Sequence, residues 1–150
     1  MKIEQTPLKD SFILTPTIFN DERGTFHETF NEVLFEKVSG QKVNFVQDNQ
    51  STSRFGVLRG LHYQAAKMAQ AKLVRAIEGR VLDIIVDIRK GSETLGKHFS
   101  IILDDISKKQ LFVPRGFAHG FITLSTTSKF AYKCDNYYDK NSERGIIYND

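Results

Sequence analysis

Apolar residues occur in short runs along the chain, and within several runs they alternate with polar positions. RVLDIIVDIR (80–89) is instead a nearly continuous apolar run, in which Val81, Asp83 and Ile85 share one face of an extended backbone. Such runs, bounded by Gly, Ser, Asp or Lys, are typical of β-strands. The pattern predicts strands at KVNFVQ (42–47), GVLRGLHYQ (56–64), AKLVRAIE (71–78), RVLDIIVDIR (80–89), KHFSIIL (97–103), KQLFVP (109–114), HGFITL (119–124) and KFAYKC (129–134).

One segment of the N-terminal third has helical character instead. NEVLFEKVSG (31–40) opens on Asn31, a residue type favoured at helix N-caps, and carries Val33, Leu34 and Val38 at helix-like spacing. Gly40 follows as a C-terminal stop signal. The sequence therefore predicts one short helix ahead of a long series of strands.

Short strands at even spacing predict a β-sandwich or a barrel. Little helix remains to cross between parallel strands, so an antiparallel double sheet of the jelly-roll type is favoured over an α/β fold. At 150 residues the chain is expected to form a single domain (1–150) that buries roughly 68–70% of its unfolded surface. We expect an all-β, cupin-like double-stranded β-helix that binds its ligand inside the barrel.

Composition and charge narrow the classes of partner. The formal net charge is +3, and the basic residues are spread along the chain rather than clustered, which argues against nucleic-acid binding. The longest apolar stretch contains Asp83 and Asp87, and no apolar run follows the N-terminal lysine, so neither a membrane span nor secretion is expected. Cys134 is the sole cysteine, which precludes an intramolecular disulfide and fits a reducing cytoplasm.

Two histidines stand in sequence words that resemble half of a cupin metal site. His62 follows a glycine at the cupin spacing, and His119 ends the word PRGFAH. The second histidine and the carboxylate of such a site are replaced by Gln64 and Lys72. A charged lysine has no lone pair to offer and repels a divalent cation, so we expect no bound metal. The two histidines alone would support the alternative of a metal-dependent cupin oxygenase or isomerase.

A fixed cation beside a histidine suits enolate chemistry. Removal of a proton next to a ketone develops negative charge on the carbonyl oxygen, and the Lys72 ammonium can stabilise that charge in a water-poor site. A neutral imidazole, with an unperturbed pKa of about 6.5, can accept the proton, so His62 is the candidate base. Inversion also needs a donor on the opposite face, which a tyrosine can provide at neutral pH. Spacing alone does not choose among Tyr63, Tyr132, Tyr137, Tyr138 and Tyr148.

Several unusual words occur in a fixed order along nearly the whole chain. They are FNDERGTFHETF (19–30), FVQDNQS (45–51), VLRGLHYQ (57–64), QAKLVR (70–75), KQLFVPRGFAHGF (109–121) and YKCDNYY (132–138). In this combination they closely resemble the dTDP-4-dehydrorhamnose 3,5-epimerase family. The resemblance implies a cupin-like jelly roll that epimerises a nucleoside-diphospho 4-keto-6-deoxyhexose at C3 and C5 without a cofactor, in rhamnose biosynthesis for surface glycans. It also implies a homodimer in which each active site borrows residues from the neighbouring N-terminal segment.

The resemblance implies roles for individual residues. By the matching words, His62 is the proton acceptor, Tyr132 the proton donor and Lys72 an enolate contact. Phe26 is expected to stack on the base of the nucleotide. The remaining contacts to the sugar nucleotide, expected to be dTDP-linked, are Arg23, Glu28, Gln47, Asp48, Asn49, Arg59, His119 and Glu143. The two arginines suit a diphosphate, because a guanidinium presents paired donors to phosphate oxygens.

Family members typically continue past the IIYND word into a segment whose aspartate orients the catalytic histidine, and this sequence ends at Asp150. A hydrogen-bonded carboxylate fixes the tautomer and ring direction of a catalytic imidazole. Asp83 alternates with Val81 and Ile85 on a predicted strand and is expected to face the interior. We therefore predict that Asp83 is the carboxylate that orients His62.

Two other functions remain open at this point. One is an epimerase that inverts only C3 or only C5 of the same sugar. The other is a non-catalytic cupin that binds a sugar nucleotide without reacting with it.

Overall fold

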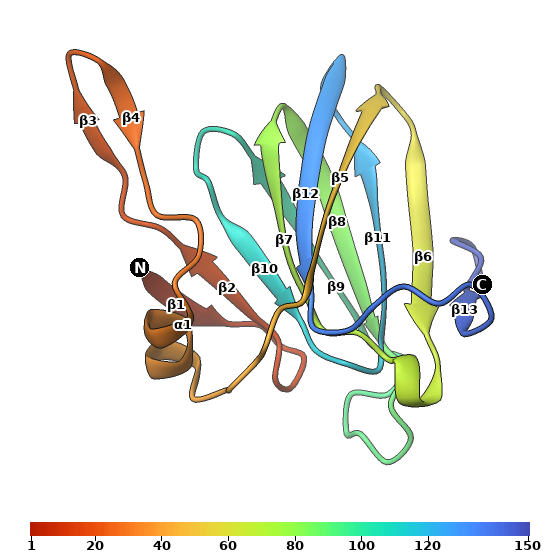
Figure 1. The fold of residues 1–150 in the computed structure, drawn as a ribbon. Helices are drawn as coiled ribbons and strands as arrows, with labels where there is room; N and C mark the ends of the chain where they lie inside the picture. Colours follow the sequence, from red (N-terminus) through yellow and green to blue (C-terminus); the bar gives the residue numbers. More distant parts are fainter.

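The computed structural model describes residues 1–150 as two facing β-sheets with a projecting hairpin (Figure 1). The larger sheet contains, in spatial order, β1 (Lys2–Gln5), β2 (Phe12–Thr15), β10 (Gln110–Val113), β7 (Lys72–Glu78), β12 (Thr127–Cys134) and β5 (Gln47–Arg54). The smaller sheet contains β13 (Glu143–Gly145), β6 (Leu58–Gln64), β11 (Phe117–Thr123), β8 (Arg80–Asp87) and β9 (His98–Asp104). The hairpin consists of β3 (Phe19–Asp21) and β4 (Gly24–Phe26), and the helices are α1 (Glu32–Ser39) and a 3₁₀ turn (Ala66–Met68). Every strand pair is antiparallel, and the predicted all-β jelly roll is confirmed.

The main core lies between the two sheets, where every second residue of a strand points inward. On β8, Val81, Asp83 and Ile85 are all buried, which confirms the predicted inward face of this strand. On β10, Leu111 and Val113 pack into the same core. The buried face of β8 therefore places the Asp83 carboxylate beside apolar side chains of the core.

A second apolar cluster covers the outer face of the larger sheet beneath α1. Phe12 on β2 and Phe112 on β10 stack with their ring centroids 4.7 Å apart. Phe35 of α1 meets the Phe112 ring edge-on, with the centroids 5.4 Å apart. The helix is thus attached to the sandwich by aromatic packing on the side away from the main core.

The predicted caps of α1 are confirmed, but its predicted apolar face is only partly correct. The Asn31 side chain accepts a hydrogen bond from the Leu34 amide at 3.0 Å, and Gly40 ends the helix in the left-handed conformation. Phe35 is the buried residue of the helix, whereas Val33 is 77% exposed. None of the helices has the length and apolarity that a membrane crossing requires.

One predicted strand was wrong, and several short strands were not predicted. Of residues 42–47 only Gln47 belongs to a strand, because β5 starts there and continues through the polar word QDNQSTSR. Its two faces are both polar, so no hydrophobic alternation marks it. Strands β1 to β4 and β13 have only three or four residues each, too few for a periodic signal.

A buried carboxylate fastens the loop between β8 and β9. Asp87 accepts hydrogen bonds from the side chains of Arg89, Ser92 and Thr94 at 2.6 to 3.0 Å. Arg89 also reaches Asp10 at 2.7 Å, which ties this loop to the N-terminal turn. Burial acts to raise the pKa of Asp87, but these donors outweigh it and hold the pKa well below its ordinary value.

We expect Asp87→Asn to lower the free energy of unfolding by roughly 2 kcal/mol near neutral pH, because the charged acceptor is lost. A carboxyl whose folded-state pKa is depressed stabilises the fold above its unfolded pKa of about 3.9, and this contribution is lost as the pH falls toward the folded value. Urea unfolding at pH 7 and pH 3 measures the difference, which should shrink at pH 3. Glu93→Gln removes an exposed charge from the same loop and is the matched control. An undiminished effect of Asp87→Asn at pH 3 contradicts the assignment.

Candidate active site

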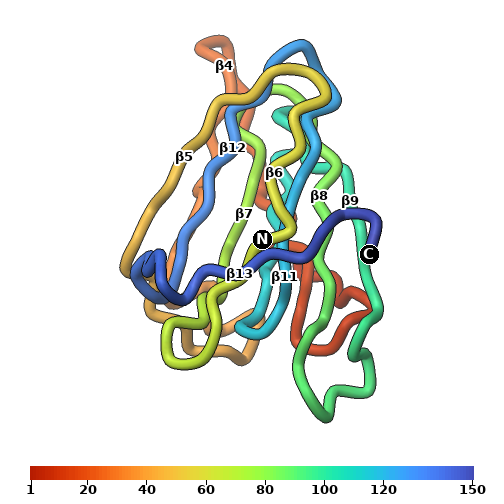
Figure 2. Tube along the Cα trace, turned by 90° about the vertical axis from the view of Figure 1, so that its right-hand side faces the viewer, coloured from red at the N-terminus to blue at the C-terminus, as the bar shows by residue number.

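Figure 2 shows the side of the molecule where β5 and β13 are the edge strands of the two sheets. On this side a cavity is lined by residues of both sheets. It consists of two adjoining hollows of about 350 and 460 Å³ that share His62, Lys72, Tyr132 and Glu143. His62 and Glu143 belong to the smaller sheet, whereas Lys72 and Tyr132 belong to the larger one. An imidazole and a carboxylate on one sheet therefore face an ammonium and a phenol on the other sheet across this cavity.

His62 stands on β6, which pairs with β11 so that His62 lies directly across from His119. Its side chain is exposed and lines both hollows. Burial lowers the pKa of His62, and the charges of Lys72 and His119 lower it further, while Glu143 raises it. The net direction favours the neutral imidazole at neutral pH, which is the form that accepts a proton.

Lys72 and Tyr132 are neighbours on the inner face of the larger sheet. The Lys72 Nζ lies 5.8 Å from the centroid of the Tyr132 ring. Burial lowers the pKa of Lys72, and burial raises the pKa of Tyr132. Tyr132 therefore holds its proton at neutral pH and is able to donate it.

The carboxylate predicted to orient His62 lies against a different histidine. Asp83 is fully buried, and its Oδ2 lies 2.9 Å from His119 Nε2, while its Oδ1 has no hydrogen-bond partner. Strand order is the reason, because β11 lies between β6 and β8. The prediction for Asp83 was therefore correct in its inward direction and wrong in its partner. Burial raises the pKa of Asp83, and the neighbouring His119 opposes that shift.

Three further predicted contacts line the same cavity: Gln47, Asn49 and Arg59. The Arg59 Nε donates to Ser53 Oγ at 2.9 Å, which fixes the direction of the guanidinium.

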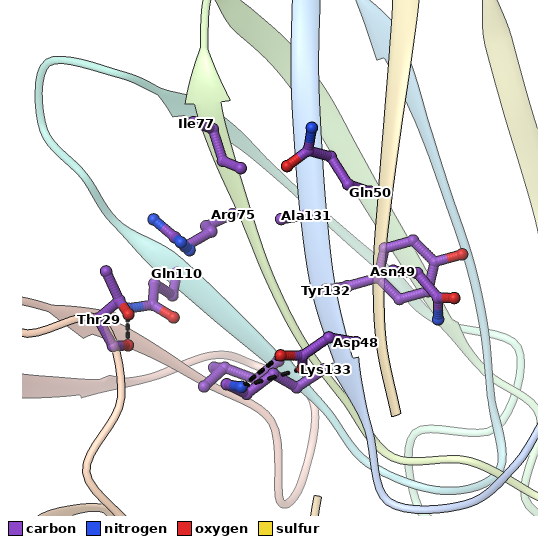
Figure 3. A pocket seen from close by; sticks show the side chains of 11 residues that line it. Thr29, Asp48, Asn49, Gln50, Arg75, Ile77, Gln110, Ala131, Tyr132 and Lys133 are labelled. Atoms are coloured by element: carbon purple, nitrogen blue, oxygen red, sulfur yellow. Dashed lines mark hydrogen bonds and ion pairs between the residues drawn. The ribbon is translucent and has the colours of Figure 1, made fainter. Parts of the chain in front are cut away.

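Asp48 does not face this cavity. It lies on the outer face of the larger sheet, where its Oδ1 accepts a hydrogen bond from Lys133 Nζ at 2.9 Å (Figure 3). Successive residues of a strand point to opposite faces, so the QDN word cannot place all three of its side chains inside. Within one chain Asp48 therefore lies outside this cavity, and its predicted contact with the sugar nucleotide stays a prediction.

The N-terminal candidates lie apart from the cavity within one chain. Arg23, Phe26 and Glu28 line neither hollow, and the β3–β4 hairpin projects away from the two sheets (Figure 1). Arg23 pairs with Asp21 at 2.6 Å, and Phe26 is 70% exposed. The Glu28 carboxylate accepts a hydrogen bond from Asn31 at 3.2 Å, close to the start of α1.

A separate groove of about 310 Å³ lies on the outer face of the larger sheet (Figure 3). Arg75 points into this groove, where burial lowers the pKa of its guanidinium, and it takes part in no salt bridge. Gln110 donates to the carbonyl oxygen of Thr29 at 2.7 Å at one side of the groove. This face of the sheet therefore presents a guanidinium without a direct salt-bridge partner, and the charge of Asp48 acts on it from a distance.

Two residues that line the cavity had no role predicted from the sequence. Gln64 appeared only as a departure from a metal motif, and Tyr138 as one of five tyrosines; both line the hollow that contains His62. The dense YKCDNYY word was the one signal that pointed to Tyr138. No group of three or more His, Cys, Asp or Glu side chains is arranged to hold a metal ion.

Comparisons with known proteins agree with this arrangement. Residues 5–150 match the protein family described as dTDP-4-dehydrorhamnose 3,5-epimerase. A protein of that name from Shigella flexneri is 51% identical over 150 residues, which are 100% of this chain and 83% of the relative. The crystal structure of a dTDP-4-dehydrorhamnose 3,5-epimerase from Elizabethkingia anophelis NUHP1 is 56% identical with a TM-score of 0.95, and the match covers 100% of this chain and 82% of that one. A dTDP-6-deoxy-D-glucose-3,5-epimerase from Legionella pneumophila Philadelphia 1, in complex with dTDP-4-keto-L-rhamnose, is 47% identical with a TM-score of 0.95 over 98% of this chain and 78% of that one.

Cys134 adjoins this site but is fully buried, and burial raises the pKa of its thiol to about 11. We expect the folded protein to react with a thiol reagent such as DTNB at pH 8 at least roughly 10²-fold more slowly than the unfolded chain, because the thiolate is the reactive form. Absorbance at fixed reagent concentration, with and without denaturant, measures both rates. Cys134→Ser gives the blank, and comparable rates in the two states would show that the thiol is open to solvent.

Proposed function

Because the chain belongs to the dTDP-4-dehydrorhamnose 3,5-epimerase family, we propose that it epimerises C3 and C5 of a dTDP-linked 4-keto-6-deoxyhexose in rhamnose biosynthesis. The observation that carries the proposal is the position of His62 and Tyr132 on opposite sheets around one cavity, with Lys72 next to Tyr132. Inversion of a stereocentre next to a ketone needs a base on one face of the carbon and an acid on the other. These two side chains supply that pair.

In each inversion His62 accepts the proton from the carbon next to the C4 ketone, and the electrons of the broken C–H bond convert the ketone to an enolate. The Lys72 ammonium stabilises the negative oxygen. Tyr132 then donates its phenolic proton to the opposite face of the carbon, and the carbonyl re-forms. Solvent removes the proton from the imidazolium and returns one to the phenolate, which restores the starting state.

The polar side chains around the cavity supply the substrate contacts in this proposal. Arg59 offers paired donors to the diphosphate, and Gln47 and Asn49 offer amide groups to the sugar or the nucleotide. His119 lines the same hollow as Arg59 and is held by the buried Asp83.

We also propose that the active molecule is a cytoplasmic homodimer. The hairpin carries two aromatic residues, Phe19 and Phe26, that are 60% and 70% exposed, and such exposed apolar groups favour a protein partner. Arg75 on the outer sheet face, which has no salt-bridge partner, supports contact with a second polar surface. A second copy that covers these regions would carry Arg23, Phe26 and Glu28 toward the cavity of its neighbour. The lone, buried thiol of Cys134 suits a reducing compartment.

The chemistry is tested by proton NMR of dTDP-4-keto-6-deoxyglucose in D₂O. We expect the C3 and C5 proton signals to disappear with the unmutated protein, and His62→Ala to slow this exchange by roughly 10²–10⁴-fold, the usual value of general-base help. Tyr132→Phe should permit exchange but reduce formation of the inverted product. His98→Ala, on an exposed strand residue outside the cavity, is the matched control.

The position of the exchange separates the alternatives. Loss of only one of the two signals indicates a C3-only or C5-only epimerase. Binding of dTDP with no exchange at high protein concentration contradicts the proposed reaction and supports a sugar-nucleotide-binding cupin.

The dimer is tested by light scattering, where we expect twice the 17.2 kDa mass of the chain. Phe26→Asp places a charge on the hairpin surface and should shift the population toward the monomer while leaving the far-UV spectrum unchanged. Ile106→Asp, at another exposed apolar residue, in the β9–β10 turn, is the control. A monomeric unmutated protein would contradict the proposed role of Arg23.

A further inference from the structure

The segment between β12 and β13 is fastened to the floor of the cavity by Gln64, the residue that replaces a metal-binding histidine. Gln64 is 6% exposed, and its Nε2 donates to the carbonyl oxygens of Met68 and Tyr137 at 2.7 and 3.0 Å. Its Oε1 accepts a hydrogen bond from the amide of Asp139 at 2.6 Å. One buried side chain therefore holds the loop on both sides of Tyr138.

The same loop fixes a carboxylate at the mouth of the cavity. The amide of Tyr138 donates to Gln47 Oε1 at 3.0 Å, so β5 also holds the loop. The Tyr138 hydroxyl then donates to Glu143 Oε2 at 2.9 Å. Glu143 is exposed, and this hydrogen bond restricts the direction of its side chain.

Strand register brings Glu143 next to His62. β13 pairs with β6 so that Gly145 is opposite His62 and Glu143 is opposite Gln64. Residues two apart on a strand share a face, so Glu143 and His62 are diagonal neighbours on the side that faces the cavity. Both line the two hollows.

The charges around His62 come from several elements. Glu143 is the carboxylate that raises the pKa of His62, against burial and the positive charges of Lys72 and His119. The titratable or charged side chains that share the hollows with His62 are Arg59, Tyr63, Lys72, His119, Tyr132, Tyr138 and Glu143. Glu143 is thus the one carboxylate among them.

We propose that Glu143 is a positioning residue for the catalytic base: held by Tyr138 and by the loop that Gln64 anchors, it stabilises the imidazolium that His62 becomes on accepting the substrate proton. The inference rests on the proposed epimerase function. A carboxylate is poorly suited to contact the anionic diphosphate, because like charges repel, whereas it favours a positive charge that develops beside it. A charge interaction over this spacing needs no direct hydrogen bond between the two side chains.

The first test is an NMR titration of the His62 imidazole in the free protein, assigned with His62→Ala. We expect Glu143→Gln to move the His62 titration to lower pH, because loss of the negative charge destabilises the imidazolium. Tyr138→Phe should move it in the same direction by a smaller amount, since Glu143 remains but is no longer held. Glu78→Gln, which removes an exposed carboxylate that pairs with Lys129 outside the cavity, is the matched control and should cause no shift.

The second test is the pH dependence of kcat/KM for epimerisation. The base must be neutral, so activity falls as the pH drops through the pKa of His62, and Glu143→Gln should move this acidic limb to lower pH. We expect kcat to fall roughly tenfold with little change in KM, a part of the 10²–10⁴-fold that general-base help provides. If Glu143 only contacted the substrate, Glu143→Gln would raise KM and leave the acidic limb of the pH profile where it is.

An unshifted His62 titration in Glu143→Gln overturns the inference, as does a change confined to KM. These outcomes are distinct from failure of the proposed function, which shows as an unmutated protein that binds dTDP but exchanges no proton. The His62 titration needs no substrate, so it tests the interaction of Glu143 with His62 in either case.

Discussion

The site depends on one buried positive charge, the ammonium of Lys72 between the two sheets, which neighbouring groups must stabilise. Moving a cation out of water is costly, and here burial lowers the pKa of Lys72. Asp83 and Glu143 oppose that shift from the facing sheet, but Lys72 takes part in no salt bridge. Because its compensation comes from charges around the cavity, the ammonium keeps its donors available for an anionic oxygen of a substrate.

Aromatic packing gives this polar site a firm floor. Phe121 and Phe130 come from the two different sheets and stack with their ring centroids 4.2 Å apart. The ring centroid of His119 lies 6.2 Å from that of Phe130, and a hydrogen bond between His119 Nε2 and Asp83 Oδ2 holds the imidazole in place. Closely packed interiors resist displacement, so the side chains that line the cavity are held at defined positions by the same contacts that stabilise the fold. Stability of the core and geometry of the site therefore depend on shared residues.

The sequence predicted long strands that contain apolar residues, and it did not predict strands that are very short or polar on both faces. β8 is a long, mostly apolar run, and α1 has both of its caps in the sequence, so both were identified. β5 has polar residues on both faces, and β13 has three residues, so local periodicity marked neither. These two edge strands are the ones that border the cavity. The strands that form the mouth of the cavity were therefore the ones that the sequence pattern did not predict.

The sequence by itself determined the chemistry available: a lysine and a glutamine at positions where a cupin has metal ligands, and His62 and Tyr132 in words typical of one enzyme family. Only the tertiary structure decided which of these groups meet. Asp83 pairs with His119 because β11 lies between β8 and β6, and Asp48 turns outward because neighbouring strand residues face opposite ways. Glu143 becomes a diagonal neighbour of His62 through the register of β13 on β6. Strand order and register arise from contacts between segments distant in the sequence, so a local pattern can indicate a strand but cannot specify its neighbours.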